Sequence, residues 1–165
     1  YNEAQIETPL GEKKSVQLSE NIVVSSILRA GLPMHQGVLN MFDRAENSFI
    51  SAYRKHHKSG QFEIKLEYIS SPSIDGKILL ICDPMIATGA SIIATLEEIA
   101  RFGNPQKIII LGIIASKAGI DAIKNANDEI DIFIGDIDEE LTAKGYIVPG
   151  LGDAGDLAFG EKIEL

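Results

Sequence analysis

The chain has 165 residues, of which 45% are hydrophobic and 24% are charged, and its formal net charge is −9. This composition fits one domain that buries a core without disulfides or a structural metal, and the acidic charge disfavours nucleic-acid binding, which depends on clustered Lys and Arg. No apolar run approaches the length that spans a bilayer.

The lone cysteine and the N-terminus indicate where the protein works. Cys82 lies inside an apolar run and has no partner cysteine in the chain, which suits a reducing compartment. Tyr1, Asn2 and Glu3 have neither the basic nor the hydrophobic character of a secretory signal. We therefore expect a cytoplasmic protein that binds neither a membrane nor a nucleic acid.

In chain order, strand-like and helix-like segments alternate. The pattern predicts strands over residues 22–28, 49–53, 62–69, 78–82, 107–115 and 130–134, and helices over 32–42, after Ser91 and around 119–126. Right-handed crossovers make this an α/β fold, with a mostly parallel twisted sheet and helices on both faces, in a single domain over residues 1–165.

A polar segment interrupts the first half of this pattern. Residues 54–60 read Arg-Lys-His-His-Lys-Ser-Gly between two strand-like runs, so residues 54–69 are predicted to form a protruding, flexible β-hairpin arm. The arm either folds over a substrate or is a plain exposed hairpin. His56 and His57 would point to opposite sides of a strand, so we expect no metal there.

The stretch from Lys77 to Ser91 has the character of an anion cradle. A buried aliphatic strand runs into a loop of Ala, Thr, Gly, Ala and Ser and then into a helix, so backbone N–H groups and the helix dipole can hold a phosphate. Asp83 ends the strand, where it can face a ribose hydroxyl or a phosphate-bound magnesium. The alternative is an ordinary strand-to-helix turn. A Walker loop is excluded, because no Gly-Lys-Ser/Thr follows the first glycine.

Arg29 is predicted to lie at the same sheet edge as Asp83. It follows the strand over 22–28 and precedes Ala30 and Gly31, and its guanidinium can grip phosphate oxygens in a bidentate way. The alternative is a solvated surface arginine.

Near the C-terminus, residues 149–155 contain Gly-x-Gly-x-x-Gly. Only ten residues follow Gly155, too few for the helix and return strand of a dinucleotide-binding unit. The segment suggests a loop whose backbone groups read the edge of a flat ligand such as a pyrimidine. The alternative is a tight C-terminal turn.

Together these motifs resemble the uracil phosphoribosyltransferases. The resemblance rests on Asp83-Pro84-Met85-Ile86-Ala87-Thr88-Gly89-Ala90-Ser91, on residues 27–32, on Tyr53-Arg54 and on residues 145–156, in the family's order. It implies the type I phosphoribosyltransferase fold, and the conversion of uracil and phosphoribosyl pyrophosphate (PRPP) to uridine monophosphate (UMP) and pyrophosphate. It further implies Mg²⁺ bound with PRPP, no metal held by the protein alone, and a homodimer or higher homo-oligomer.

The resemblance also assigns the site residues. Those implied for PRPP are Arg29, Arg54, Asp83, Pro84, Met85, Ile86, Ala87, Thr88, Gly89, Ala90, Ser91 and Asp153. Those implied for uracil are Ile147, Gly152, Asp153 and Ala154, and the catalytic roles fall to Arg29, Asp83 and Asp153.

The chain departs from the family pattern at several points. Ala90 stands where glycine is usual, and its methyl group is tolerable only if its φ is helical. Residues 116–119 read Ser-Lys-Ala-Gly in place of a Pro-Glu-Gly form, and the chain is expected to lack the family's N-terminal segment. A regulator with this fold that binds nucleotides without turnover is the alternative function.

Overall fold

The computed structural model describes residues 2–17, 21–56 and 62–163. The main sheet is built from β3 (Ile22–Leu28), β4 (Glu46–His56), β5 (Phe62–Ser70), β6 (Ile78–Cys82), β7 (Met85–Ile86), β8 (Lys107–Ser116) and β9 (Asp131–Asp138). The helices are α1 (Gly31–Leu39), α2 (Ala90–Ile99), α3 (Lys117–Ala126) and α4 (Ala154–Phe159), with a 3₁₀ turn at Ala100–Phe102. Two small hairpins pair β1 (Asn2–Thr8) with β2 (Gly11–Gln17), and β10 (Glu140–Leu141) with β11 (Ile147–Val148).

The sheet is mostly parallel, as predicted. Its order is β5-β4-β3-β6-β8, and both β7 and β9 pair with β8. Only the β4–β5 pair is antiparallel among the described pairs of this sheet. Because helices cover a parallel sheet on both sides, its central strand β6 is apolar throughout, and Leu79, Leu80, Ile81 and Cys82 are all buried.

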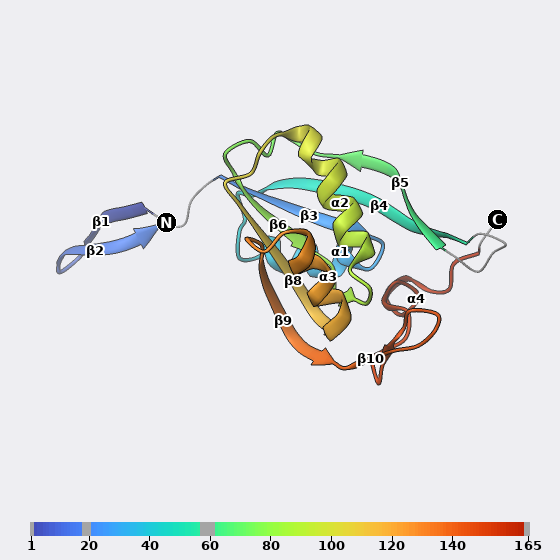
Figure 1. Cartoon of the computed structure of the whole chain (residues 1–165). Coiled ribbons are helices and arrows are strands. Elements are labelled where there is room, and N and C mark those ends of the chain that lie inside the picture. The colour runs from blue at the N-terminus through green and yellow to red at the C-terminus, as the bar shows by residue number, and fades with distance from the viewer. Residues whose placement is uncertain (1, 18–20, 57–61, 164–165) are drawn as a thin grey trace.

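Helices lie on both faces of this sheet (Figure 1). On one face, Ile92 and Ile99 of α2 and Ile123 of α3 pack into the core with the sheet residues Leu79 and Ile81. On the other face, α1 covers Leu80 and Cys82 with apolar side chains that include Met34 and Val38. This arrangement leaves the carboxyl ends of the parallel strands at one edge of the molecule, where α/β proteins place their ligands.

Several predicted boundaries were wrong. The helix predicted over 32–42 ends at Leu39, where the chain turns and the N–H groups of Met41 and Phe42 donate to the Val38 carbonyl. The predicted strand 49–53 is part of the longer β4, and the predicted strand 130–134 starts one residue before β9, which continues to Asp138. Pairing with neighbouring strands extends beyond the apolar residues in both cases.

The predicted hairpin is built from β4 and β5, which pair antiparallel from Phe49↔Ser70 to His56↔Phe62. Its tip at residues 57–61 lies outside the described residues, and so does the side chain of Arg54. In the described part of the chain, no helix is long and apolar enough to cross a membrane.

Candidate active site at the carboxyl edge of the sheet

The turns that follow β3 and β6 lie against each other. A Cβ atom added to Gly31 would lie 2.7 Å from the Cys82 carbonyl oxygen and 2.7 Å from Ser26 Oγ, so only glycine fits. The chain therefore brings the Arg29–Gly31 turn beside the start of the Asp83 loop. The sequence prediction that Arg29 and Asp83 share one sheet edge is consistent with this contact.

The loop from Asp83 to Ser91 is shaped by short-range contacts. Asp83 Oδ1 accepts a hydrogen bond from the Met85 N–H at 3.2 Å, and Met85 and Ile86 form β7 beside β8. Gly89 has a φ of +75° and is the N-cap residue of α2, so that position has no capping side chain, and Thr88 Oγ1 accepts a long hydrogen bond of 3.4 Å from the Ala90 N–H. Amide groups at the start of a helix whose N-cap residue is glycine suit an anionic ligand.

Ala90 is compatible with this loop. It is the first residue of α2, and no described residue other than glycine has a positive φ. The left-handed conformation falls on Gly89, so the methyl group of Ala90 costs no backbone strain.

The start of α3 supports the loop from behind. Ser116 Oγ donates to the Ala87 carbonyl at 2.5 Å and accepts from the Gly119 N–H at 2.9 Å, which caps α3. A Cβ atom on Gly119 would lie 2.3 Å from the Ala87 carbonyl oxygen. Residues 116–119, which the sequence interpretation left without a role, therefore fix the backbone of the loop from Asp83 to Ser91. A serine three residues before an amide at a helix start was the available signal.

The glycine-rich segment forms a turn and then a helix. Gly150 has a φ of +54°, and its N–H donates to Asp138 Oδ2 at 3.0 Å. Ile147 is buried just before this turn. The interpretation of the segment as a loop missed α4, a helix of six residues that begins at Ala154. Asp138, which the sequence analysis did not single out, holds the turn in place.

Asp153 caps α4 and is held as a carboxylate. Its Oδ1 accepts from the Asp156 N–H at 2.9 Å, and Lys162 Nζ lies 3.5 Å from its Oδ2. Partial burial acts to raise the pKa of Asp153, but hydrogen bonds from the Asp156 and Gly155 N–H groups and the Lys162 ammonium outweigh it, so the pKa is lowered overall.

Arg29 contacts this same segment. Its Nη2 lies 2.7 Å from Asp156 Oδ1, and its Nη1 and Nη2 each donate to the Gly160 carbonyl at 3.3 Å. A Cβ atom on Gly155 would lie 3.6 Å from Arg29 Nη2. The structure thus joins the Arg29 turn directly to the α4 segment, and joins that segment to the Asp83 loop through the turn at Gly31.

Cys82 is a structural thiol, as its place in the apolar strand indicated. It is fully buried in β6, and burial together with the neighbouring Asp83 raises its pKa to about 12. A thiol that stays protonated at neutral pH is a poor nucleophile.

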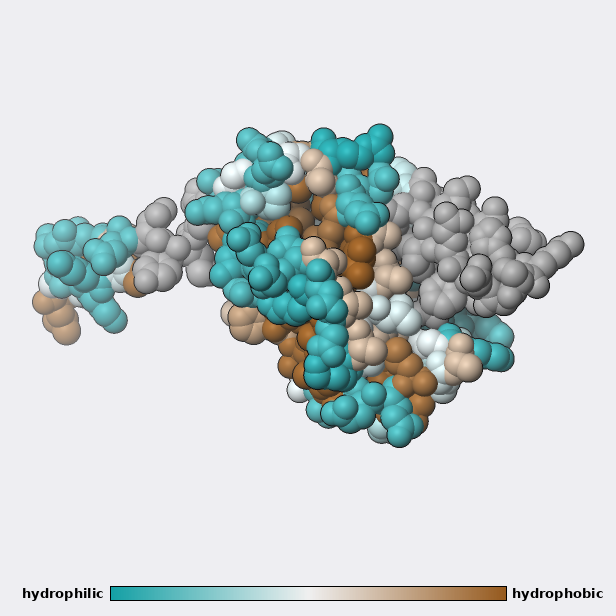
Figure 2. Space-filling model, in the orientation of Figure 1, coloured by the Kyte–Doolittle hydropathy of each residue, from teal (hydrophilic) through white to brown (hydrophobic). Residues whose placement is uncertain are grey.

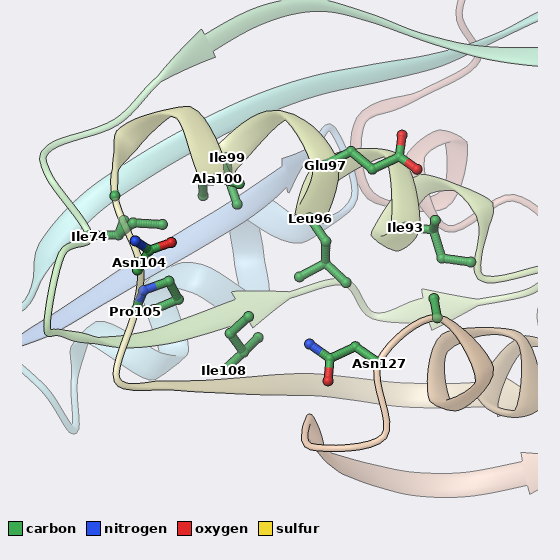
Figure 3. A pocket seen from close by; sticks show the side chains of 12 residues that line it. Ile74, Ile93, Leu96, Glu97, Ile99, Ala100, Asn104, Pro105, Ile108 and Asn127 are labelled. Atoms are coloured by element: carbon green, nitrogen blue, oxygen red, sulfur yellow. The ribbon is translucent and has the colours of Figure 1, made fainter.

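A separate groove of about 340 Å³ lies near the amino end of β8. Hydrophobic side chains are visible between α2 and α3 in the space-filling view (Figure 2), and the close-up shows Leu96 and Ile108 pointing toward one another (Figure 3). Glu97 is the one charged residue that lines it. Asn104 and Asn127 also line it, and a groove whose one charge is a carboxylate does not suit an anionic sugar phosphate.

Comparison with solved structures defines the class of protein. A protein from Aquifex aeolicus superposes with a TM-score of 0.86 at 36% identity, over 99% of this chain and 77% of that one. A purine phosphoribosyltransferase from Pyrococcus horikoshii shares the fold, with a TM-score of 0.55 at 16% identity over 73% of this chain and 72% of that one. The fold is therefore the one seen in a phosphoribosyltransferase.

Sequence comparison then gives the family. The family model described as uracil phosphoribosyltransferase matches residues 1–161. A uracil phosphoribosyltransferase from Porphyromonas gingivalis is 48% identical over 159 residues, covering 96% of this chain and 74% of the relative. A second one, from Thermococcus gammatolerans, is 41% identical over 165 residues, covering 98% of this chain and 73% of the relative. The chain belongs to the uracil phosphoribosyltransferase family.

Proposed function

We propose that this chain transfers the 5-phosphoribosyl group of PRPP to uracil, forming UMP and pyrophosphate. The observation that carries the proposal is the contact of Arg29 with the α4 segment. This contact sets a cation suited to a diphosphate beside Asp153 and the glycine-rich turn, where the family resemblance puts the base. An acceptor base and a departing diphosphate must both lie near the anomeric carbon for the transfer to occur.

PRPP would be bound by backbone amide groups and by positively charged side chains. The loop from Pro84 to Ser91 offers amide groups at the start of α2 for the 5-phosphate, with the hydroxyls of Thr88 and Ser91. Arg29 and, by resemblance, Arg54 would contact the diphosphate. The lining of this loop by glycine and alanine supports the assignment, because small side chains let a phosphate approach the backbone.

The residues present fit a magnesium ion carried by the substrate. Asp83 stands half-buried at the end of β6, and no cluster of three or more ligand residues was found among the described residues. Mg²⁺ in such sites is bound by one or two carboxylates and by substrate phosphates, so Asp83 would hold it or the ribose hydroxyls. The ion would supply charge neutralisation to the diphosphate.

Uracil would lie against Ile147, Gly152, Asp153 and Ala154. The buried Ile147 and the Asp138-held turn at Gly150 make this backbone rigid, which suits the reading of a pyrimidine edge by hydrogen bonds. A ring nitrogen of uracil would form the bond to the anomeric carbon as the bond to the diphosphate breaks, and its proton would pass to solvent. Arg29 and the backbone donors would stabilise the negative charge of the departing diphosphate, without a covalent nucleophile.

An assay with purified protein tests this proposal. Incubation with uracil, PRPP and Mg²⁺ should yield UMP and pyrophosphate, and EDTA should abolish the product. Hypoxanthine and guanine serve as control bases, and turnover of either above that of uracil would contradict the base assignment. Absence of UMP, together with UMP binding in a titration, would favour the nucleotide-binding regulator.

We also propose that the chain works in the cytoplasm as a homodimer or larger homo-oligomer. Large apolar side chains on adjacent strands, Ile113 of β8 at 56% and Phe133 of β9 at 60%, are exposed in the single chain, which supports association. Light scattering should give a mass of at least twice 17.9 kDa. A mass equal to one chain at every concentration would contradict it.

A further inference from the structure

The ion pair of Arg29 with Asp156 joins two parts of the site that are far apart in the chain. Arg29 follows β3, Asp156 lies in the first turn of α4, and the two side chains are about one-third exposed. The N–O distance of 2.7 Å is typical of a charge-assisted hydrogen bond. The pair therefore fixes the direction of the guanidinium and the position of α4 relative to the turn after β3.

Arg29 retains hydrogen-bonding capacity while it is held in this way. The interactions with described residues use Nη1 and Nη2, toward Asp156 and the Gly160 carbonyl, and leave Nε without a described acceptor. A guanidinium has several N–H donors in a fixed fork. An anion can therefore bind Arg29 while Asp156 stays paired with it.

Asp156 is also tied to the base side of the site. Its backbone N–H donates to Asp153 Oδ1, so its position in α4 is coupled to the carboxylate that the family resemblance places near both substrates. Loss of the Arg29–Asp156 ion pair would therefore affect the binding of both PRPP and uracil.

We propose that Asp156 is a positioning residue that orients Arg29 toward the diphosphate of PRPP and locks the uracil-binding segment against it. This inference rests on the function proposed above for the same site. It differs from a competing role, in which Asp156 would occupy Arg29 and be displaced by substrate. The two roles predict opposite changes in the affinity for PRPP.

Substitution Asp156→Asn tests the proposal, because the amide keeps an oxygen acceptor and loses the charge. We expect the KM for PRPP to rise about tenfold, the KM for uracil to rise as well, and kcat to change less. Asp156→Glu, which keeps the charge, should restore part of the PRPP affinity. Glu161→Gln is the matched control, since Glu161 is exposed in the adjacent segment and has no partner among the described residues.

A double-mutant cycle separates positioning from a general structural effect. In an Arg29→Gln background, Asp156→Asn should add little further loss, because the residue it orients is gone. Losses that simply add, or a KM for PRPP in Asp156→Asn equal to or below that of the wild type, would overturn the proposal. If Asp156→Asn does not fold, as judged by thermal melting, Asp156→Glu takes its place, because its longer side chain displaces the carboxylate: its KM for PRPP should exceed that of the wild type, and a KM equal to or below it would overturn the proposal.

Calorimetry with magnesium pyrophosphate distinguishes failure of the inference from failure of the proposed function. Wild-type protein that makes no UMP but binds pyrophosphate about tenfold more tightly than Asp156→Asn would refute the function and keep the positioning role. Wild-type protein that makes UMP and binds pyrophosphate no better than Asp156→Asn would refute the positioning role alone.

Discussion

Asp153 shows how one carboxylate can serve both a helix and a site. Its Oδ1 caps α4, the function proposed above would place it in contact with both substrates, and the Lys162 ammonium lies 3.5 Å from its other oxygen. A side chain that is already ionised and held by backbone donors needs little reorganisation when substrate arrives. The hydrogen bond from the Asp156 N–H therefore both caps α4 and helps to lower the pKa of Asp153.

Because the pKa of folded Asp153 is lower than its ordinary value of 3.8, the charged form contributes stability to α4. This contribution is fully present above pH 3.8 and is lost as the pH falls through the lowered pKa. In an NMR titration, we expect the Asp156 amide, which donates to Asp153, to shift with a midpoint below 3.8.

Substitution Asp153→Asn is the control for this titration, because an amide caps a helix nearly as well and does not ionise. The acid shift of the Asp156 amide should disappear in that variant. A midpoint above 3.8 in the wild type would contradict the assignment of the low pKa.

At the scale of elements, the loop from Asp83 to Ser91, proposed to bind PRPP, depends on close contact with α3. Gly119→Ala would place a Cβ atom 2.3 Å from the Ala87 carbonyl oxygen, a backbone atom that cannot turn aside. We expect this substitution to shift the loop, to raise the KM for PRPP by about tenfold or more, and to lower the melting temperature.

Gly37→Ala in α1 is the matched control, because an added Cβ there meets nothing within 4 Å. Replacing glycine by alanine inside a helix should stabilise the protein by about 0.5–1 kcal/mol and leave PRPP affinity unchanged. Unchanged PRPP kinetics in Gly119→Ala would show that α3 does not set the loop.

At the scale of the whole molecule, the fold was predictable and much of the site's support was not. Strands 22–28 and 78–82 are mostly apolar segments bounded by polar residues, so the sequence pattern gave their limits correctly. The β1–β2 hairpin is polar and charged, and α4 is short and begins among glycines, so neither has an apolar pattern to reveal it.

The residues that support the site, Asp156 and Asp138, could not be predicted from the sequence for a different reason. Arg29 and Asp83 carry chemistry that a motif reveals, whereas Asp156 acts through a partner 127 residues away and Asp138 through one 12 residues away. The role of such residues depends on a contact that exists only in the folded chain, so their residue types alone do not identify them as part of the site.

The same sheet that aligns the loops must also supply most of the stability. Ile81 is fully buried in β6, at the centre of the sheet, and packs in the cluster that α2 and α3 cover. We expect Ile81→Ala to lower the free energy of unfolding by about 2–5 kcal/mol, because it removes buried methyl groups and leaves a cavity between well-packed layers. Urea unfolding measures this loss as a lower midpoint at unchanged slope. Ile163→Ala, at a side chain that is 87% exposed, should change the free energy of unfolding by less than about 0.5 kcal/mol, and equal effects of the two substitutions would contradict the central role of β6.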